Sequence, residues 1–189
     1  MPGPHHGALI RTFTGLEPNP LDLREHDIRI EDIAHSLALC NRFSGHTKKP
    51  ISVAQHSVYV SRLCQQYGNS CALQALLHDA AEAYLGDVTK WLKHTPAFEG
   101  YRDAERRAQQ VIYKRFGCSM GEDSRITAAD RIMVRFEGRR GFGPEFKIDH
   151  VMYPELTKDE VAAVGKWTPW SWKASEELFL VHYGMYTRK

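Results

Sequence analysis

Residues 72–87 read ALQALLHDAAEAYLGD, and this stretch decides the fold expected for the rest of the chain. Its pattern is apolar almost all round, which is typical of a helix that runs through the middle of a domain. The apolar positions are Ala72, Leu73, Leu76, Leu77, Ala80, Ala81 and Ala83. Gly86 supplies a stop signal after them, so the sequence predicts one buried helix that ends beside Asp87.

Three ionisable residues interrupt this apolar pattern: His78, Asp79 and Glu82. Burying such groups costs free energy unless they are paired or bind a metal. Glu82 follows His78 by four residues and Asp79 by three, so a helix would direct all three toward one sector. One imidazole and two carboxylates on that sector, with a third carboxylate at Asp87, indicate a functional site.

The composition is that of one globular domain. The chain has 189 residues, of which 42% are hydrophobic and 25% are charged. The net charge of +2 is too small to imply a nucleic-acid partner, and no apolar run reaches the roughly 18 residues of a membrane span. The four cysteines form no C-x-x-C pair, and the first residues lack a signal-peptide core. Reduced thiols and a cytoplasmic location are therefore expected.

Helical signals dominate the chain and predict an all-α fold with an extended N-terminal arm. Residues 1–29 form the expected arm, with one short strand near 10–14. Residues 30–189 form the expected domain, with a metal core at about 30–140 and a C-terminal loop and helix at 141–189. The other expected helices run over about 31–42, 52–67, 97–116, onward from 124, and from a Thr168-Pro169 start to Gly184. Residues 139–157 form the longest irregular segment, which suits a lid or substrate loop.

Four candidate metal ligands fall on three of these expected helices: His56, the adjacent pair His78 and Asp79, and Asp130. Imidazole with carboxylate suits a divalent transition ion such as Mn, Fe, Co, Ni or Zn. Neighbouring residues on a helix point about 100° apart, so His78 and Asp79 can share an ion only if it lies close against the helix. The H-E-x-x-H, P-loop and G-x-S-x-G patterns are absent.

The order H…HD…D resembles the HD-domain metal-dependent phosphohydrolases. VAQHS around His56, LLHDAAEAYLGD around His78 and AADR around Asp130 are similar to the small HD-domain nucleotidases. That group includes bacterial 5′-deoxynucleotidases and phage dATP triphosphohydrolases. The run IEDIAHSLALCNRFSGH at 30–46 resembles the phage-type members, so the likeness covers roughly residues 28–140.

The resemblance implies one divalent ion at the four ligands, with a further ion possible on the substrate phosphates. It places Glu82 where the family handles a proton and Asp87 where a second carboxylate assists or orients the water. It places Arg42 and Lys93 where related enzymes grip phosphate. Phe43 corresponds to an aromatic residue that packs on the sugar and disfavours a ribose 2′-hydroxyl.

Three functions follow as hypotheses. The first is hydrolysis of a deoxynucleoside triphosphate, with dATP favoured, into deoxynucleoside and triphosphate. NRFSGH and the cationic neighbourhood of Lys90, Lys93 and His94 tilt the choice slightly toward this substrate. The second is a 5′-deoxynucleotidase that acts on monophosphates, and the third is a non-catalytic nucleotide-binding regulator. In each case the partner is a small deoxynucleotide, and a homo-oligomer is an open alternative.

One basic run falls outside these roles. Arg135, Arg139 and Arg140 are expected on a solvent face, with phosphate binding as the alternative.

Overall fold

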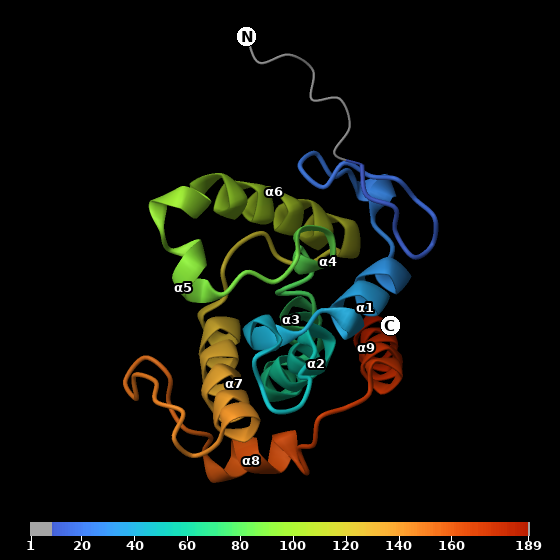
Figure 1. Cartoon of the computed structure of the whole chain (residues 1–189). Coiled ribbons are helices and arrows are strands. Elements are labelled where there is room, and N and C mark those ends of the chain that lie inside the picture. The colour runs from blue at the N-terminus through green and yellow to red at the C-terminus, as the bar shows by residue number, and fades with distance from the viewer. Residues whose placement is uncertain (1–8, 189) are drawn as a thin grey trace.

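The computed structural model describes residues 9–188, and Figure 1 shows their arrangement. The α-helices are α1 (Ile30–Leu39), α2 (Val53–Cys64), α3 (Asn69–Leu76), α4 (Glu82–Leu85), α5 (Lys90–Lys93), α6 (Glu99–Phe116), α7 (Ser124–Phe142), α8 (Lys158–Val164) and α9 (Trp172–Thr187). Short 3-10 helices cover Glu25–Asp27, Arg42–Gly45, Gln65–Tyr67 and Pro96–Phe98. Within residues 9–188 there is no strand, only an isolated bridge between Asn41 and Ser52. The all-α prediction is confirmed.

Helix α2 is the centre of the fold, and it packs against α1, α3, α7, α8 and α9. Every residue of α2 except Arg62 is buried. One hydrophobic cluster joins residues of α1, α2, α3, α6 and α9, and a second joins α2 and α3 to α7 and α8. A side chain on α2 can therefore face a metal site only if its polar atoms find partners inside the protein.

The stretch that was expected as one helix is broken. Helix α3 ends at Leu76, residues 77–81 form turns, and α4 begins at Glu82, so the prediction over 72–87 is wrong. A side chain of α6 explains the break, because Gln109 Nε2 donates to the Leu77 carbonyl at 2.6 Å and Gln109 Oε1 accepts from the Ala81 amide at 3.1 Å. These two bonds satisfy backbone groups that a helix would otherwise pair.

Several helix ends follow the predicted signals. The Ser52 hydroxyl accepts from the Gln55 amide at the start of α2, and Gly117, in the left-handed region at φ 69°, ends α6. Both capping modes are those expected for the residue types. Two of the predicted helices, over about 52–67 and 97–116, agree with α2 and α6.

The C-terminal third departs from the prediction. Helix α9 begins at Trp172 with Ser171 as its cap, not at Thr168-Pro169, and it continues past Gly184. A glycine inside a helix costs only about 1 kcal/mol relative to alanine, which packing of the helix can offset. Helix α7 runs to Phe142, so the irregular segment is shorter than 139–157, and α8 follows it. A capping box between Thr157 and Glu160 starts α8, which the sequence analysis did not predict.

The N-terminal arm carries no strand at 10–14. Ile10 and Thr12 donate to the carbonyls of Pro18 and Leu16, so the segment folds back on itself in a tight turn without a strand ladder. Residues 1–8 of the expected arm lie outside the described residues. Helix α1 ends at Leu39 rather than near residue 42, because the Arg42 amide donates to the Ile51 carbonyl at 2.8 Å in an extended pairing.

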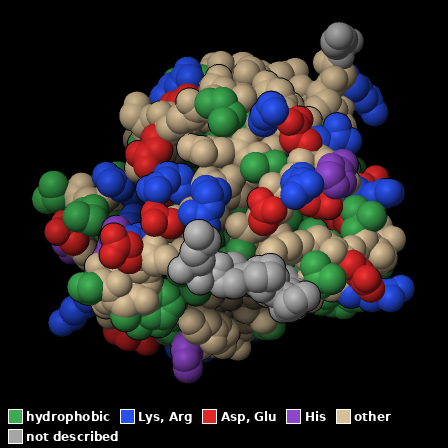
Figure 2. All heavy atoms as spheres, turned by 90° about the horizontal axis from the view of Figure 1, so that it is seen from above, with side chains coloured by type: hydrophobic (Ala, Val, Ile, Leu, Met, Phe, Trp, Pro, Cys, Tyr) green, Lys and Arg blue, Asp and Glu red, His purple; other side chains and the backbone are tan. Residues whose placement is uncertain are grey.

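The surface carries charges of both signs. Figure 2, the view from above Figure 1, shows Lys and Arg side chains interspersed with Asp and Glu across that face. This mixture agrees with the small net charge of the sequence. Among the helices of residues 9–188, none combines the length and the hydrophobicity needed to cross a bilayer.

Candidate metal centre and substrate pocket

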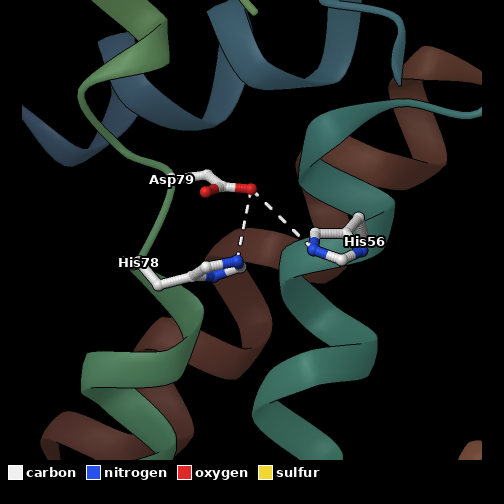
Figure 3. Close-up of side chains that lie close together, drawn as sticks. All are labelled: His56, His78 and Asp79. Atoms are coloured by element: carbon white, nitrogen blue, oxygen red, sulfur yellow. Dashed lines mark ion pairs between the residues drawn. The ribbon is translucent and has the colours of Figure 1, made fainter. Parts of the chain in front are cut away.

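The predicted ligands converge from three segments of the chain. His56 comes from α2, His78 and Asp79 from the 77–81 turn, and Asp130 from α7. The ligand atoms of His56, His78 and Asp79 all lie within 4.8 Å of one another (Figure 3). Asp79 Oδ2 is 3.2 Å from His78 Nε2 and 3.8 Å from His56 Nε2, and Asp130 Oδ1 is 3.2 Å from His56 Nε2. His56, His78 and Asp79 thus form one compact group, and Asp130 lies beside it through its contact with His56.

The donor set fits a divalent transition ion. His56 Nε2 and His78 Nε2 are both buried and make no hydrogen bond, although carboxylate oxygens lie close to each. Two ligand atoms that bind one ion at right angles, each at about 2.1 Å, are about 3 Å apart. The 3.2 Å distances are close to this value, and the two imidazole nitrogens have no hydrogen-bond partner, so the arrangement suits a shared ion.

The break between α3 and α4 lets two adjacent residues face the same point. In a helix, His78 and Asp79 would diverge by about 100°, whereas the turn brings their ligand atoms to 3.2 Å. His78 Nδ1 donates to the Ala75 carbonyl at 2.8 Å. That bond places the proton on Nδ1 and leaves the Nε2 lone pair directed at the site.

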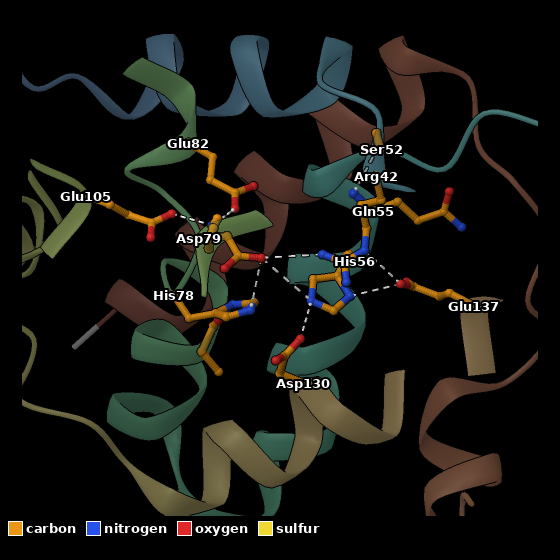
Figure 4. Close-up of polar contacts among 12 residues, drawn as sticks. Arg42, Ser52, Gln55, His56, His78, Asp79, Glu82, Glu105, Asp130 and Glu137 are labelled. Carbon is orange, nitrogen blue, oxygen red and sulfur yellow. Dashed lines mark hydrogen bonds and ion pairs between the residues drawn. The ribbon is translucent and has the colours of Figure 1, made fainter. Parts of the chain in front are cut away.

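A buried carboxylate that the sequence analysis missed supports the second imidazole. Glu137 Oε2 accepts from His56 Nδ1 at 3.0 Å and pairs with Arg42 Nε at 3.1 Å (Figure 4). The side chain of Glu137 is fully buried. A sequence signal was present, because Glu137 follows Asp130 by seven residues and so lies on the same face of α7.

The charges of the ligands are strongly perturbed. Burial and the nearby Arg42 guanidinium oppose protonation of His56, but the Glu137 and Asp130 carboxylates outweigh both and raise its pKa to about 9. Burial alone would raise the pKa values of Asp79 and Asp130. The nearby imidazoles of His56 and His78 outweigh this effect, so both pKa values are lowered. In the metal-free protein, the protonated His56 thus supplies part of the positive charge that the carboxylates require.

The predicted proton-handling residue lies beside this centre. Glu82 is buried, and its Oε1 accepts from Lys93 Nζ at 3.0 Å, while Lys93 also pairs with Glu105. Burial and the charge of Asp79 raise the pKa of Glu82 well above its usual range, and contact with Lys93 offsets this only in part. Burial also raises the pKa of Asp87, with Asp79 adding to it and Arg42 opposing it.

The remaining predicted residues line one wall of the site. A cavity of about 320 Å³ is bordered by Arg42, Phe43, Asp87 and Lys93 together with Asp79, Glu82 and Asp130. Arg42 is 11% exposed and pairs with Asp79 as well as Glu137. Phe43 adopts φ 54°, in the left-handed region that non-glycine residues seldom occupy. Backbone strain of this kind concentrates at functional sites.

A second cavity also adjoins the metal centre, and it overlaps the first. It measures about 730 Å³ and shares Asp79, Glu82 and Asp130 with the first. Its lining contains both basic side chains, namely Lys90, Lys93, His94, Arg102, Arg106 and Arg131, and acidic ones, namely Asp79, Glu82, Glu105, Glu122, Asp123 and Asp130. The structure therefore brings all nine predicted site residues to the metal centre or to the two cavities beside it.

The fold and the site define an all-α protein with a candidate His-Asp metal centre. No family model matches the chain. The uncharacterized protein YfdR of Escherichia coli strain K12 is 36% identical over 132 residues, which cover 70% of this chain and 71% of YfdR. The uncharacterized protein RCAP_rcc00048 of Rhodobacter capsulatus is 35% identical over 143 residues, with 70% of this chain and 72% of that protein covered. The chain belongs to the same protein family as YfdR.

Proposed function

We propose that this protein is a metal-dependent deoxynucleotide phosphohydrolase of the HD-domain type, with dATP or a related deoxynucleoside triphosphate as substrate. The observation that carries the proposal is the compact group of His56, His78 and Asp79, with a second carboxylate, Asp130, 3.2 Å from His56 Nε2. Their order along the chain, H…HD…D, is that of the family that the sequence resembles. The ion would be Co, Mn, Zn, Fe or Ni, which this kind of donor set accepts.

The proposed reaction is attack by water on the α-phosphorus. His56, His78, Asp79 and Asp130 would hold a divalent ion, which would supply an acidified water and polarise a phosphoryl oxygen. Attack breaks the bond between the α-phosphorus and the 5′-oxygen, which releases triphosphate and a deoxynucleoside. The leaving oxygen needs a proton and the water must lose one. Glu82, with its raised pKa, is positioned at the cavity to carry that proton.

Residues around the cavities supply the other parts that phosphoryl transfer needs. Lys93 and Arg42 bring positive charge to the first cavity, where phosphate oxygens carry negative charge in the transition state. Asp87 borders the same cavity and would orient the water. Phe43 would pack against the deoxyribose. A further cation would accompany the substrate phosphates.

The second cavity favours a triphosphate over a monophosphate. Its volume of about 730 Å³ is more than twice the 320 Å³ of the first cavity, and Asp79, Glu82 and Asp130 border both. Arg106 and Arg131 border only this second cavity, and Arg102 borders both. Guanidinium groups bind phosphate oxygens in bidentate geometry, which suits the β- and γ-phosphates.

Product analysis tests the proposal. Protein loaded with Co²⁺ or Mn²⁺ is incubated separately with ATP and with each deoxynucleoside mono-, di- and triphosphate, and chromatography resolves nucleoside, phosphate, pyrophosphate and triphosphate. Deoxyadenosine and triphosphate from dATP support the proposal. Phosphate from several deoxynucleoside monophosphates would establish a 5′-deoxynucleotidase instead.

Two controls separate metal binding from turnover. The double substitution His78→Ala with Asp79→Ala should abolish both, and full activity in that variant would refute the metal mechanism. An absence of products from every substrate by protein that has bound its ion would favour the nucleotide-binding regulator.

A further inference from the structure

A third cavity lies away from the metal centre, between α7 and the segment that leads into α8. It measures about 300 Å³ and shares no lining residue with the two cavities at the metal centre. Its lining combines basic and apolar side chains: Ile132, Arg135, Phe136, Arg139, Arg140, Pro154, Glu155, Leu156 and Val161. The basic run that the sequence predicted on a solvent face thus borders a hollow.

The cavity has more positive charge than its own acidic group can balance. Arg135 Nη2 and Arg139 Nη1 both donate to a single oxygen, Glu155 Oε1, at 2.5 and 3.0 Å. The Glu155 side chain is 64% exposed, whereas that of Arg135 is 9% exposed. Arg135 Nε is buried and has no acceptor, and Arg140 lies over the Phe136 ring. Two guanidinium groups therefore share one carboxylate that solvent can reach, and the third, of Arg140, borders the same cavity without a carboxylate partner in the described residues.

We propose that this cavity is a second anion site, which binds a small organic phosphate in place of the Glu155 carboxylate. Glu155 offers a single oxygen to both Arg135 and Arg139, whereas a phosphoryl group has several acceptor oxygens. A phosphoryl group can also bind a guanidinium group in bidentate geometry. The apolar wall of Phe136, Leu156 and Val161 receives a ring or other apolar part of the ligand. The volume lies at the lower limit for ligand pockets and suits a mononucleotide-sized molecule.

The site is connected to the proposed substrate pocket by one side chain. Arg135 Nη1 donates to the Tyr153 carbonyl at 3.0 Å. The Tyr153 residue lines the 320 Å³ cavity, and Lys90 Nζ lies 5.5 Å from the centre of its ring. A ligand that engages Arg135 thus acts on a residue that borders the other cavity.

Isothermal titration of the metal-free protein with deoxyadenosine monophosphate and, separately, with inorganic phosphate tests the proposal. The unmodified chain is compared with R139Q, E155Q and R107Q. Arg107 is an exposed arginine of α6 that lines none of the three cavities, so R107Q is a matched control for the loss of one charge. Arg139 and Glu155 also line neither of the two cavities at the metal centre. Any binding of the probe in those two cavities is therefore common to all four proteins.

The two substitutions in the cavity should act in opposite directions. R139Q should weaken deoxyadenosine monophosphate binding at this site by about tenfold or more, because a charged donor is lost. E155Q should strengthen it, because the competing carboxylate is gone, and R107Q should leave it unchanged. Equal binding by R139Q and R107Q, or weaker binding by E155Q, would overturn the proposal. Equal affinity for inorganic phosphate and deoxyadenosine monophosphate would refute the role of the apolar wall.

Discussion

The substitution Glu137→Gln tests whether the Glu137 carboxylate orients His56, one of the candidate metal ligands. The Glu137 carboxylate accepts from His56 Nδ1 and pairs with Arg42 Nε, and it is fully buried. A glutamine oxygen can accept from one of these groups but carries no charge for either. Loss of a charged hydrogen bond costs about 1.5–3 kcal/mol. Loss of a partner behind a metal-binding histidine typically weakens metal affinity by about 10–100-fold.

The assay is titration of the metal-free protein with Co²⁺ or Mn²⁺, alongside urea unfolding of the same samples. Glu177→Gln is the matched control, because Glu177 is an exposed glutamate of α9. Glu137→Gln should lower both the metal affinity and the free energy of unfolding, while Glu177→Gln changes neither. Metal affinity within a factor of two of the unmodified chain would refute the inference that Glu137 orients His56.

Three further predictions concern protons and packing. Because the pKa of His56 is raised to about 9, its imidazole is protonated at neutral pH before a metal binds. Metal binding should therefore release about one proton, and the metal affinity should rise by about tenfold for each pH unit of increase up to pH 9. Calorimetric titration in buffers of different ionisation enthalpy measures the number of protons released. Glu82→Gln should abolish turnover but retain the ion, and unchanged kcat would exclude its proton role. Gly138→Ala should destabilise the fold by about 1–3 kcal/mol, since a methyl group there overlaps the Phe146 ring. Gly184→Ala, in open space within α9, should instead be neutral or stabilising in thermal melts.

The sequence predicted the fold where local signals are sufficient. The all-α class and the extent of α2 and α6 follow from periodicity and from caps such as Ser52 and Gly117. The break after Leu76 could not be predicted, because Gln109, 32 residues after Leu77, satisfies the backbone at the break. Local propensity favours a helix there, and a tertiary contact overrides it.

In the candidate site, too, local sequence signals predicted some residues, while residues that depend on tertiary packing were missed. The spacing of His78 and Asp79 indicated a site, and the ligand set as a whole came from the resemblance. Glu137 was missed because an acidic residue on a helix is usually solvated, and only the packing of α7 against α2 buries it. The α9 start was misplaced for a related reason: Pro169 suits a first turn, but Ser171 provides the hydroxyl that caps the helix.

The origin of the ligands in three segments also affects how the chain would fold. Asp130 follows His56 by 74 residues, so an ion that holds both joins parts of the chain that are far apart before folding. Such a site exists only after α2, the 77–81 turn and α7 have docked, so the proposed ion would bind the native state in preference to the unfolded one. At an ion concentration one hundred times its dissociation constant, this preference adds about 2.7 kcal/mol to stability. If the proposed ion binds, its supply in the cell would then affect how long the folded protein persists.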